Sequence, residues 1–500
     1  MRRAALWTVL MLAAALPALA GDPSTVIYLR PADALDLNPW QANDLYSNEV
    51  SANIFEGLVR FRRNDAVVEP CLATSWEMGD NGCSWRFTLR RGVRFHDGTP
   101  FDSRAVLYSF QNRMAGRQQA YQRRGSLFAV IVGVRALAPD LVEIRLSRPY
   151  APFLTALADS AGFIQSPAPR SGEFAPVGTG PFRFVSWTRG RSLILARFAG
   201  YWGGRPGVER IVFKVMADPL GRVLQIRNGS ADMAIIQSGK EYEELARRSD
   251  VTVLSHPSID THYLGFNIRR RPFDRVEVRL ALRYVIPKGN LIKKIFQNLA
   301  QPAFTPLPPA IFPGQGPEPA GDVNLAAARS LLKGAGLADG FACSLYYPDG
   351  QQGVEELADL LAVMARQVRI TVRKVKLPFT ELVKAVDRGD HDLLMMGWST
   401  GPDPDFFLSP LFTFEPGNRN RFFYQNPELT RLLEQGRATL DEPQRQRIYL
   451  QALELLERDV PWIPLFHLID NLATRSGVRG LFFTPLGQVV FREITKESTP

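Results

Sequence analysis

Residues 84–100 read SWRFTLRRGVRFHDGTP, and this stretch decides how the rest of the chain is interpreted. Apolar and polar side chains alternate from Ser84 to Leu89, as is typical of a half-buried strand. Gly92 and Gly98 then allow tight turns where residues with a Cβ would be strained. The stretch therefore predicts one strand of a hairpin followed by a tightly turned segment, with aromatic side chains supplying the buried area.

The preceding residues predict the other strand of this hairpin. Leu72–Met78 is strand-like, and the polar run Glu77–Gly82 indicates the turn. We expect Met78 to pair with Cys83, which places Cys71 about 23 Å from Cys83 at about 3.3 Å per residue. Because a disulfide needs Cα atoms within about 7 Å, the two cysteines are predicted to be free thiols.

Outward from the hairpin, strand patterns dominate up to about residue 270 and helix patterns dominate afterwards. Asn426-Pro427 and Asp441-Glu442-Pro443 are typical helix starts, with a capping side chain and a proline in the first turn. The Pro/Gly-rich stretch 302–321 predicts a long surface connection. The fold class is therefore α/β with mixed sheets. The clearest strands are 142–146, 182–185, 192–195 and 210–215, and the clearest helices include 278–286 and 448–456.

The N-terminus has the three parts of a secretory signal peptide. Arg2 and Arg3 give a basic start, residues 4–19 are apolar, and Ala18 and Ala20 are the small residues that determine cleavage after Ala20. A membrane anchor is the alternative, but the apolar run is short for a span and ends at a cleavage site. No cysteine follows the cleavage point, so we expect an exported, periplasmic protein without a lipid anchor.

Composition excludes several classes of function. The chain has 500 residues, 60 Lys+Arg, 50 Asp+Glu, three cysteines and five histidines. Removing residues 1–20 takes away two arginines, so the mature charge is (60 − 2) − 50 = +8. The basic residues are spread out rather than clustered among aromatics, which disfavours nucleic-acid binding. No nucleophile motif, phosphate loop or zinc-ligand spacing is present, so no catalytic residue, metal site or cofactor is predicted.

An ordered set of motifs covers nearly all of the chain after the signal peptide. Its members are NIFEGL at 53–58, LATSWE at 72–77, residues 85–100, PVGTGPF at 176–182, YW at 201–202, LGFN at 264–267, VRLAL at 278–282, GW at 397–398 and PWIPLF at 461–466. In content and order this set resembles the extracytoplasmic solute-binding proteins of the peptide/nickel ABC-transporter family, the dipeptide- and oligopeptide-binding type.

The resemblance implies a two-lobed clamshell with an extra inserted domain in the first lobe. The first lobe would contain residues 21–55, 182–269 and 478–500, the inserted domain 56–181 and the second lobe 270–477. It also implies that His96 and Asp97 form a turn rather than a catalytic pair. A binding protein of this kind would have to close preferentially on its ligand for the transporter to recognise the loaded state.

The family's peptide receptors carry an Asp shortly after the Gly-Trp pair, which grips the α-amino group of the peptide. Here Thr400-Gly401 stands at that spacing, and Asp403 could substitute only through a shifted loop. Trp398, as an apolar wall, and Ser399 and Thr400, as hydrogen-bonding groups, are the expected ligand contacts. From the opposite lobe, the candidates are Asn43 and Tyr46. Core packing of Trp398 and helix capping by Asn43 are equally open interpretations.

The function expected from the resemblance is a monomeric periplasmic receptor that delivers peptides, or peptide-sized solutes, to the permease of an ABC importer. Because the amino-group anchor is missing, a non-peptide ligand such as a metal chelate or a sugar is the alternative. A secreted hydrolase is the third hypothesis, and it is disfavoured because no nucleophile–base pair is visible.

Overall fold

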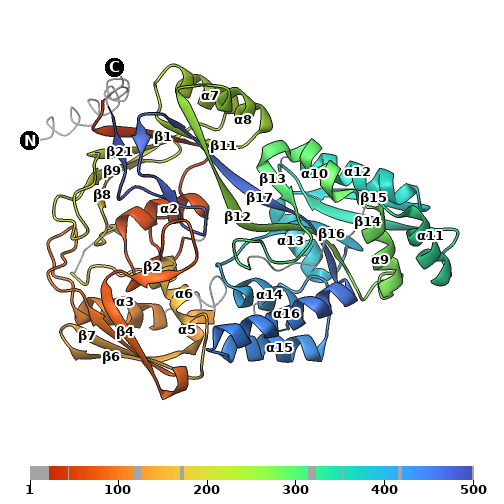
Figure 1. Cartoon of the computed structure of the whole chain (residues 1–500), viewed down its shortest axis with the longest axis horizontal. Coiled ribbons are helices and arrows are strands. Elements are labelled where there is room, and N and C mark those ends of the chain that lie inside the picture. The colour runs from red at the N-terminus through yellow and green to blue at the C-terminus, as the bar shows by residue number, and fades with distance from the viewer. Residues whose placement is uncertain are drawn as a thin grey trace, which may run out of the picture. The chain divides into compact units, whose positions relative to one another are not determined.

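The computed structural model describes residues 22–42, 44–115, 126–168, 174–312, 323–351, 353–414 and 419–497 (Figure 1). The predicted signal peptide and Asn43 lie outside these ranges. The chain divides into two compact units. Unit 1 contains residues up to 148, 153–256 and 470–500, and unit 2 contains 149–152 and 257–469. The lobe boundary expected from the resemblance, 270–477, compares with 257–469 for the main segment of unit 2.

The main sheet of unit 1 is built on β1 (Thr25–Arg30), every residue of which is buried. β1 pairs in parallel with two strands, and antiparallel strands extend the sheet on both sides. Buried positions on consecutive residues explain the nearly continuous apolar sequence of β1. The order is Asn471–Thr474 of β17, β11 (Met233–Ile236), β1, β10 (Arg210–Val215), β9 (Ser192–Arg197) and β8 (Phe182–Thr188).

Unit 1 also contains a four-stranded antiparallel sheet, in which β4 (Ala73–Gly79), β5 (Ser84–Leu89), β7 (Leu141–Leu146) and β6 (Ile131–Ala138) follow one another. The remaining elements of the unit are short strands and helices that surround the sheets. They are α2 (Leu45–Ile54), β2 (Val59–Phe61), β3 (Val68–Pro70), η2 (Asp80–Gly82), α3 (Ser103–Ala115), α5 (Ser126–Val130), α6 (Phe153–Ala158), η3 (Ser160–Gly162), α7 (Pro219–Arg227), α8 (Gly239–Ala246), β18 (Val478–Arg479), β19 (Phe482–Phe483), β20 (Val489–Val490) and β21 (Thr495–Lys496).

Unit 2 is an α/β layer that contains both parallel and antiparallel strand pairs, including β13 with residues 466–468 of β17. β15 (Ile370–Leu377), β14 (Phe341–Pro348) and β16 (Leu393–Trp398) run in parallel, and residues 261–266 of β12 pair antiparallel with β16. The other elements are α9 (Val276–Val285), α10 (Lys288–Phe296), η4 (Gln297–Leu299), β13 (Ala300–Pro302), α11 (Leu325–Gly334), α12 (Val354–Arg366), α13 (Phe379–Arg388), α14 (Pro404–Phe412), α15 (Pro427–Ala438) and α16 (Glu442–Asp459).

Each unit has its own hydrophobic core. In unit 1 the apolar residues of β1 and α2 pack with Phe213 and Phe491, and in unit 2 those of α9, α12 and β14 pack with Phe466. The chain passes from one unit to the other within β12 (Val251–Phe266) and β17 (Trp462–Arg475), and also around Pro149–Pro152. The α/β class predicted from the sequence is confirmed by this mixture of sheets and helices.

The predicted register of the first hairpin is wrong by two residues. Met78 pairs with Trp85, not with Cys83, because η2 forms the turn and leaves Cys83 outside the strand. A register shift between Ala73 and Ser75 then brings Leu72 next to Arg90, whose backbone N–H donates to the Leu72 carbonyl over 2.7 Å. The three cysteines are free thiols, and Cys71 and Cys343 are buried.

Candidate functional site

The residues predicted to contact a ligand lie in two places, which are described separately. In unit 2 they follow β16, where Trp398 is the last residue of the strand. The indole Nε1–H of Trp398 donates to the Phe407 carbonyl over 3.0 Å, in the first half of α14. This bond ties the loop after β16 to the helix that follows it. It also leaves the half-buried ring of Trp398, rather than its N–H group, for contact with another molecule.

The two hydroxyl side chains after Trp398 are weakly engaged. Ser399 is exposed, and among the described residues it makes no side-chain hydrogen bond. Thr400 is half-buried, and within the described ranges its Oγ1 reaches only the Gly401 carbonyl, over 3.4 Å. Both hydroxyls can therefore still donate or accept a hydrogen bond. This arrangement is compatible with the predicted role of the two residues as polar ligand contacts.

Asp403 lies at the start of α14 and is 4% exposed. Its Oδ1 accepts a hydrogen bond from the Asp405 N–H over 2.8 Å, as the N-cap of the helix, and another from Arg445 of α16 over 2.6 Å. The next acid, Asp405, is also buried and forms an ion pair with Arg437 of α15 at 3.0 Å. Each carboxylate of this loop therefore already has a cationic partner within the protein.

Burial has the largest effect on Asp405 and raises its pKa, although Arg437 opposes that shift. A carboxyl group that depends on its own arginine for its charge is a poor anchor for a second cation. The two pairs instead hold α14 against α15 and α16, and the position of the loop after Trp398 depends on that packing.

In unit 1, Tyr46 is the second residue of α2, in the first turn after the N-cap Asp44. Its side chain is half-buried, and the Arg30 guanidinium lies 5.4 Å from the centre of its ring. Burial is the main cause that raises the pKa of Tyr46 to about 12. The phenol is therefore protonated at neutral pH and can donate a hydrogen bond.

Arg30 holds Tyr46 in place, and the sequence did not identify it as a site residue. Arg30 is fully buried at the end of β1, and its Nη1 donates to the Tyr46 carbonyl over 3.0 Å. It also pairs with the buried Glu49 at 3.4 Å, and Glu49 accepts a further bond from the Tyr28 hydroxyl over 3.1 Å. The one signal in the sequence was the arginine that ends the apolar run TVIYLR. A charged residue at the end of a buried strand is expected to be exposed, so the pattern did not indicate a buried arginine.

Three of the sequence motifs meet at one carboxylate, that of Glu56 in NIFEGL, which is 8% exposed. It accepts hydrogen bonds from Thr179 of PVGTGPF over 2.9 Å, from the Tyr201 hydroxyl over 2.9 Å and from Trp202 Nε1 over 2.7 Å. Burial raises the pKa of Glu56, while these three donors oppose the shift. The three motifs are far apart in the sequence, and in unit 1 they come together as one polar cluster around this carboxylate.

The glycines of PVGTGPF serve the same junction. A Cβ at Gly178 would lie 2.1 Å from the Ile54 carbonyl oxygen, and one at Gly180 would lie 2.7 Å from it. Both distances are far below a normal contact, so the backbone of this segment can approach the end of α2 only without side chains. The sequence therefore needs glycine at these two positions for close backbone approach.

His96 and Asp97, the pair that could have indicated catalysis, also contribute to this region. The His96 backbone N–H donates to the Gly178 carbonyl over 3.0 Å, and its Nε2 lies 3.0 Å from the Gly180 carbonyl oxygen. Asp97 Oδ2 accepts a hydrogen bond from the Ser166 hydroxyl over 2.7 Å. The two side chains thus point to different partners and fasten a turn, as the resemblance implied.

Across the ranges that the structure describes, no helix is both long and apolar enough to cross a membrane. In the same ranges, no three His, Cys, Asp or Glu side chains come together as a metal site.

Comparison with known proteins agrees with the architecture and the motifs. The profile described as "Bacterial extracellular solute-binding proteins, family 5 Middle" matches residues 67–419. The glutathione-binding protein GsiB of Salmonella choleraesuis (strain SC-B67) is 30% identical over 489 residues, covering 94% of each chain.

Solved structures agree with this assignment. The ABC transporter-associated periplasmic binding protein DppA from Helicobacter pylori, in complex with the peptide STSA, has 25% identity and a TM-score of 0.77, covering 94% of this chain and 98% of that one. The binding protein AgaA from A. tumefaciens R10, in complex with agropinic acid, has 25% identity and a TM-score of 0.77, covering 95% of this chain and 99% of that one.

These findings define the class first: the protein is a two-lobed α/β solute receptor, the substrate-binding component of an ABC importer. More specifically, the chain belongs to family 5 of the bacterial extracellular solute-binding proteins. Members of this family bind peptides or other small solutes and work with ABC permeases. The resemblance noted from the sequence motifs is confirmed.

Proposed function

We propose that this receptor captures a peptide, or a solute of similar size, in the periplasm and passes it to the membrane permease of an ABC importer. The observation that carries the proposal is the 30% identity to a glutathione-binding protein over 94% of both chains. The likeness to a peptide-bound DppA supports the same ligand class. A tripeptide-sized ligand is therefore the first choice to be tested.

We propose that Trp398, Ser399 and Thr400 contact the ligand from unit 2, and that Asn43 and Tyr46 contact it from unit 1. The exposed Ser399 hydroxyl, the weakly bonded Thr400 hydroxyl and the protonated Tyr46 phenol support this assignment. The carboxylate of Asp403 is already paired with Arg445, so Asp403 remains a candidate only as part of the loop after Trp398. The loop then offers hydrogen bonds and an apolar ring, but no uncommitted negative charge.

The pairing of Asp403 and Asp405 with arginines also supports the second candidate, a non-peptide ligand such as a metal chelate or a sugar. A ligand without a free ammonium group does not need the missing carboxylate. The complex of AgaA with agropinic acid is in keeping with this alternative.

The remaining parts of the proposal concern the whole protein. We propose that residues 1–20 are a cleaved signal peptide, that the mature protein is a monomer without a lipid anchor, and that it catalyses no reaction. We further propose that residues 56–181 form the inserted domain of the first lobe, an assignment that the four-stranded sheet β4-β5-β7-β6 supports.

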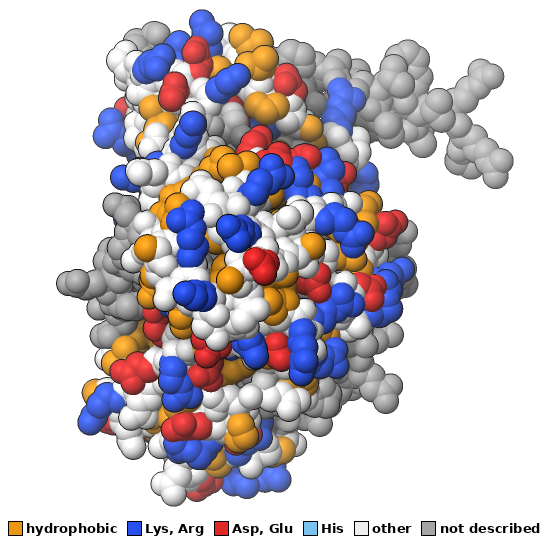
Figure 2. Space-filling view, turned by 90° about the vertical axis from the view of Figure 1, so that its right-hand side faces the viewer, with side chains coloured by type: hydrophobic (Ala, Val, Ile, Leu, Met, Phe, Trp, Pro, Cys, Tyr) orange, Lys and Arg blue, Asp and Glu red, His pale blue; other side chains and the backbone are white. Residues whose placement is uncertain are grey.

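Nucleic acid is not proposed as a partner. On the face shown in Figure 2, Lys and Arg side chains are interspersed with Asp and Glu rather than gathered in one basic patch. Pairs such as Lys374–Asp359 and Lys376–Glu355 neutralise part of the positive charge locally. Binding to a phosphate backbone requires a continuous run of uncompensated cations.

The test is a thermal-shift screen of the mature protein, purified without refolding, against glutathione, di- to pentapeptides, metal chelates and sugars. A ligand that binds the native state raises the melting temperature through linkage. A response to peptides supports the first candidate, and a response only to chelates or sugars moves the assignment to the second. Turnover of a ligand that is abolished by His96→Ala would overturn the receptor proposal in favour of a hydrolase.

The contact residues are tested by replacing one exposed hydroxyl. Ser399→Ala should weaken binding of the ligand found in the screen by about 3- to 10-fold, as expected for one lost hydrogen bond. It should leave the melting temperature of the unliganded protein unchanged, because Ser399 makes no side-chain hydrogen bond among the described residues. Ser249→Ala, at an exposed serine of unit 1, is the matched control and should bind normally. Equal affinity of both variants would remove Ser399 from the site.

A further inference from the structure

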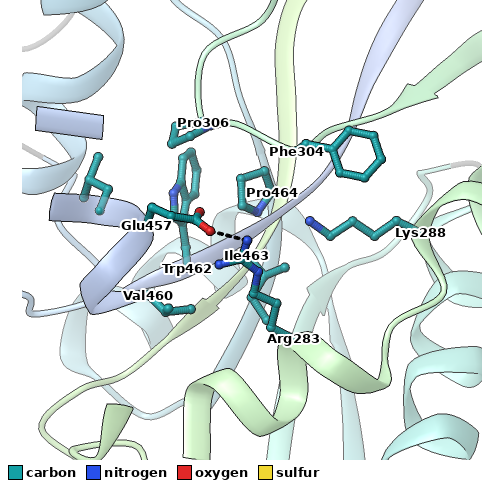
Figure 3. Close-up of a pocket in the computed structure, with 10 residues that line it drawn as sticks. Arg283, Lys288, Phe304, Pro306, Glu457, Val460, Trp462, Ile463 and Pro464 are labelled. Carbon is teal, nitrogen blue, oxygen red and sulfur yellow. Dashed lines mark ion pairs between the residues drawn. The ribbon is translucent and has the colours of Figure 1, made fainter. Parts of the chain in front are cut away.

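A small pocket in unit 2 contains a buried charge that the receptor function does not use (Figure 3). Within it, the centre of a water-sized sphere can occupy about 10 Å³, so the free space is larger than one such sphere. Its walls come from α9, the start of α10, the segment after β13, the end of α16 and the start of β17. A site of this size admits a water molecule or a monatomic ion, but not a peptide.

Lys288, the first residue of α10, supplies the charge. It is 9% exposed, and its Nζ donates to the Ala303 carbonyl over 3.1 Å. Within the described ranges no carboxylate lies within 4 Å of this ammonium group, and the ring of Phe304 lies 5.6 Å from it. In Figure 3 the amine extends toward Pro464 and Arg283, into the space that the lining residues surround.

The other charged groups in the pocket wall cancel each other. Arg283 of α9 forms an ion pair with Glu457 of α16, marked by the dashed line in Figure 3. The pocket therefore carries a net charge of +1 when Lys288 is protonated. An isolated buried charge is costly, and it is relieved either by loss of the proton or by a counter-ion.

The electrostatics of Lys288 reflect this lack of a counter-charge. Burial is the main cause that lowers the pKa of Lys288 to about 7, Arg283 adds to the shift and Glu457 opposes it. From β17, His467 is close enough for Lys288 to lower the pKa of its imidazole in turn. Among Arg283, Glu457 and His467, only Glu457 is negative, and it is already paired with Arg283. A bound anion would therefore be the main source of negative charge to compensate Lys288.

Two further features of the wall favour an anion over a cation. The Nε1–H of Trp462, a residue that is 2% exposed, has no hydrogen-bond acceptor in the described part of the chain. The first turn of α10 begins at the pocket, and the N-terminal end of a helix carries a partial positive charge. The wall thus combines an ammonium group and the positive end of a helix, and it includes a tryptophan whose indole N–H is unused in the described part of the chain.

We propose that this pocket binds a monatomic monoanion of about the size of chloride, with Lys288 as its counter-charge. The proposal goes beyond the receptor function, because the pocket is too small for the transported ligand. The anion-binding proposal can therefore be refuted while ligand capture and delivery remain intact. The site would link the stability of unit 2 to the halide concentration of the medium.

The experiment is thermal unfolding of the mature protein at about pH 6, where the Lys288 amine is charged. Sodium gluconate, whose anion is too large for the pocket, is replaced by sodium bromide or chloride at a constant ionic strength of about 0.15 M. We expect the halide to raise the melting temperature of the wild-type protein by about 2 °C. The rise should disappear at about pH 9, where the amine is neutral.

Two variants assign the effect to the pocket. Lys288→Met should remove the halide-dependent rise, whereas Lys294→Met, at an exposed lysine of the same helix, should retain it. Crystals of the wild-type protein soaked in bromide should show an anomalous peak beside Lys288. No halide effect in the wild-type protein, an equal effect in Lys288→Met, or bromide only at other positions would overturn the proposal. The bromide soak decides the matter even if Lys288→Met does not fold.

Discussion

Glu56 shows how much a single buried carboxylate does in this receptor. Its two oxygens accept hydrogen bonds from Thr179, Tyr201 and Trp202, and the Cys71 thiol lies 3.7 Å from Oε1. Charge-assisted hydrogen bonds of this kind are roughly twice as strong as neutral ones. The residue therefore stabilises the junction of segments that are more than one hundred positions apart in the sequence.

Glu56→Leu should lower the free energy of unfolding by about 3 kcal/mol, because it leaves the buried Thr179 and Tyr201 hydroxyls and the half-buried Trp202 indole without their acceptor. Urea unfolding followed by circular dichroism measures the change. Glu77→Leu, at an exposed acid of β4, is the control and should alter stability by less than about 0.5 kcal/mol. A change of similar size in both variants would mean that the cluster around Glu56 contributes nothing specific.

The buried histidines make the protein sensitive to mild acid. His391 is fully buried, its Nε2 lies 3.0 Å from the Arg421 carbonyl oxygen, and burial lowers its pKa to about 4. Between pH 6.5 and about 4 the unfolded chain binds a proton that the folded chain excludes. By linkage, the stabilisation that this neutral imidazole provides is complete above pH 6.5 and is lost as the pH falls toward 4.

His391→Phe should therefore reduce the acid sensitivity of the protein. The pKa difference of about 2.5 units corresponds to about 3 kcal/mol at most. Urea unfolding of wild type and variant at pH 8 gives the packing cost of the substitution, since the His391 imidazole is neutral at that pH in both the folded and the unfolded wild-type protein. The same comparison at about pH 4.5 should show a smaller deficit for the variant, and an unchanged deficit would contradict the assignment.

At the scale of elements, the strands and helices with strong local signals were predictable. β5 has the predicted bounds because its side chains alternate, and β10 because its apolar run has a polar residue on either side of it. Asn426 and Asp441 cap α15 and α16 as their side chains indicated. The long strand β12 was not predicted, since polar residues and Pro257 interrupt its pattern. The register of β4 and β5 was wrong because a helical turn and a bulge, not the strand pattern, decide it.

The position of α14 depends on two buried ion pairs that no local signal indicates. Asp405→Asn should destabilise the protein by about 3–5 kcal/mol, because it removes the carboxylate charge that pairs with the largely buried Arg437. Unfolding by urea measures this loss. Asp390→Asn, which breaks the exposed pair with Arg388, is the control and should cost less than about 1 kcal/mol. A small effect of Asp405→Asn would mean that packing of its apolar residues alone holds α14.

At the scale of the whole molecule, export is the property that the first residues predict. Protein expressed with its natural N-terminus in a Gram-negative host should be recovered from the periplasm with Gly21 as its first residue. Intact-mass measurement and N-terminal sequencing check this outcome. Ala20→Phe should block processing and give the full-length mass, because the cleavage enzyme requires a small residue at this position. Full-length wild-type protein in the periplasm would contradict the predicted cleavage.

The sequence alone was sufficient for the class, the family and several individual elements, because short motifs, side-chain alternation and helix caps are local properties. It also indicated the loss of the amino-group anchor after Trp398. Only the tertiary structure decided which distant residues meet: Glu56 with Thr179, Tyr201 and Trp202, Arg30 with Tyr46, and Asp403 with Arg445. These pairings depend on three-dimensional packing of buried charges, and a buried charge looks in the sequence like any exposed one.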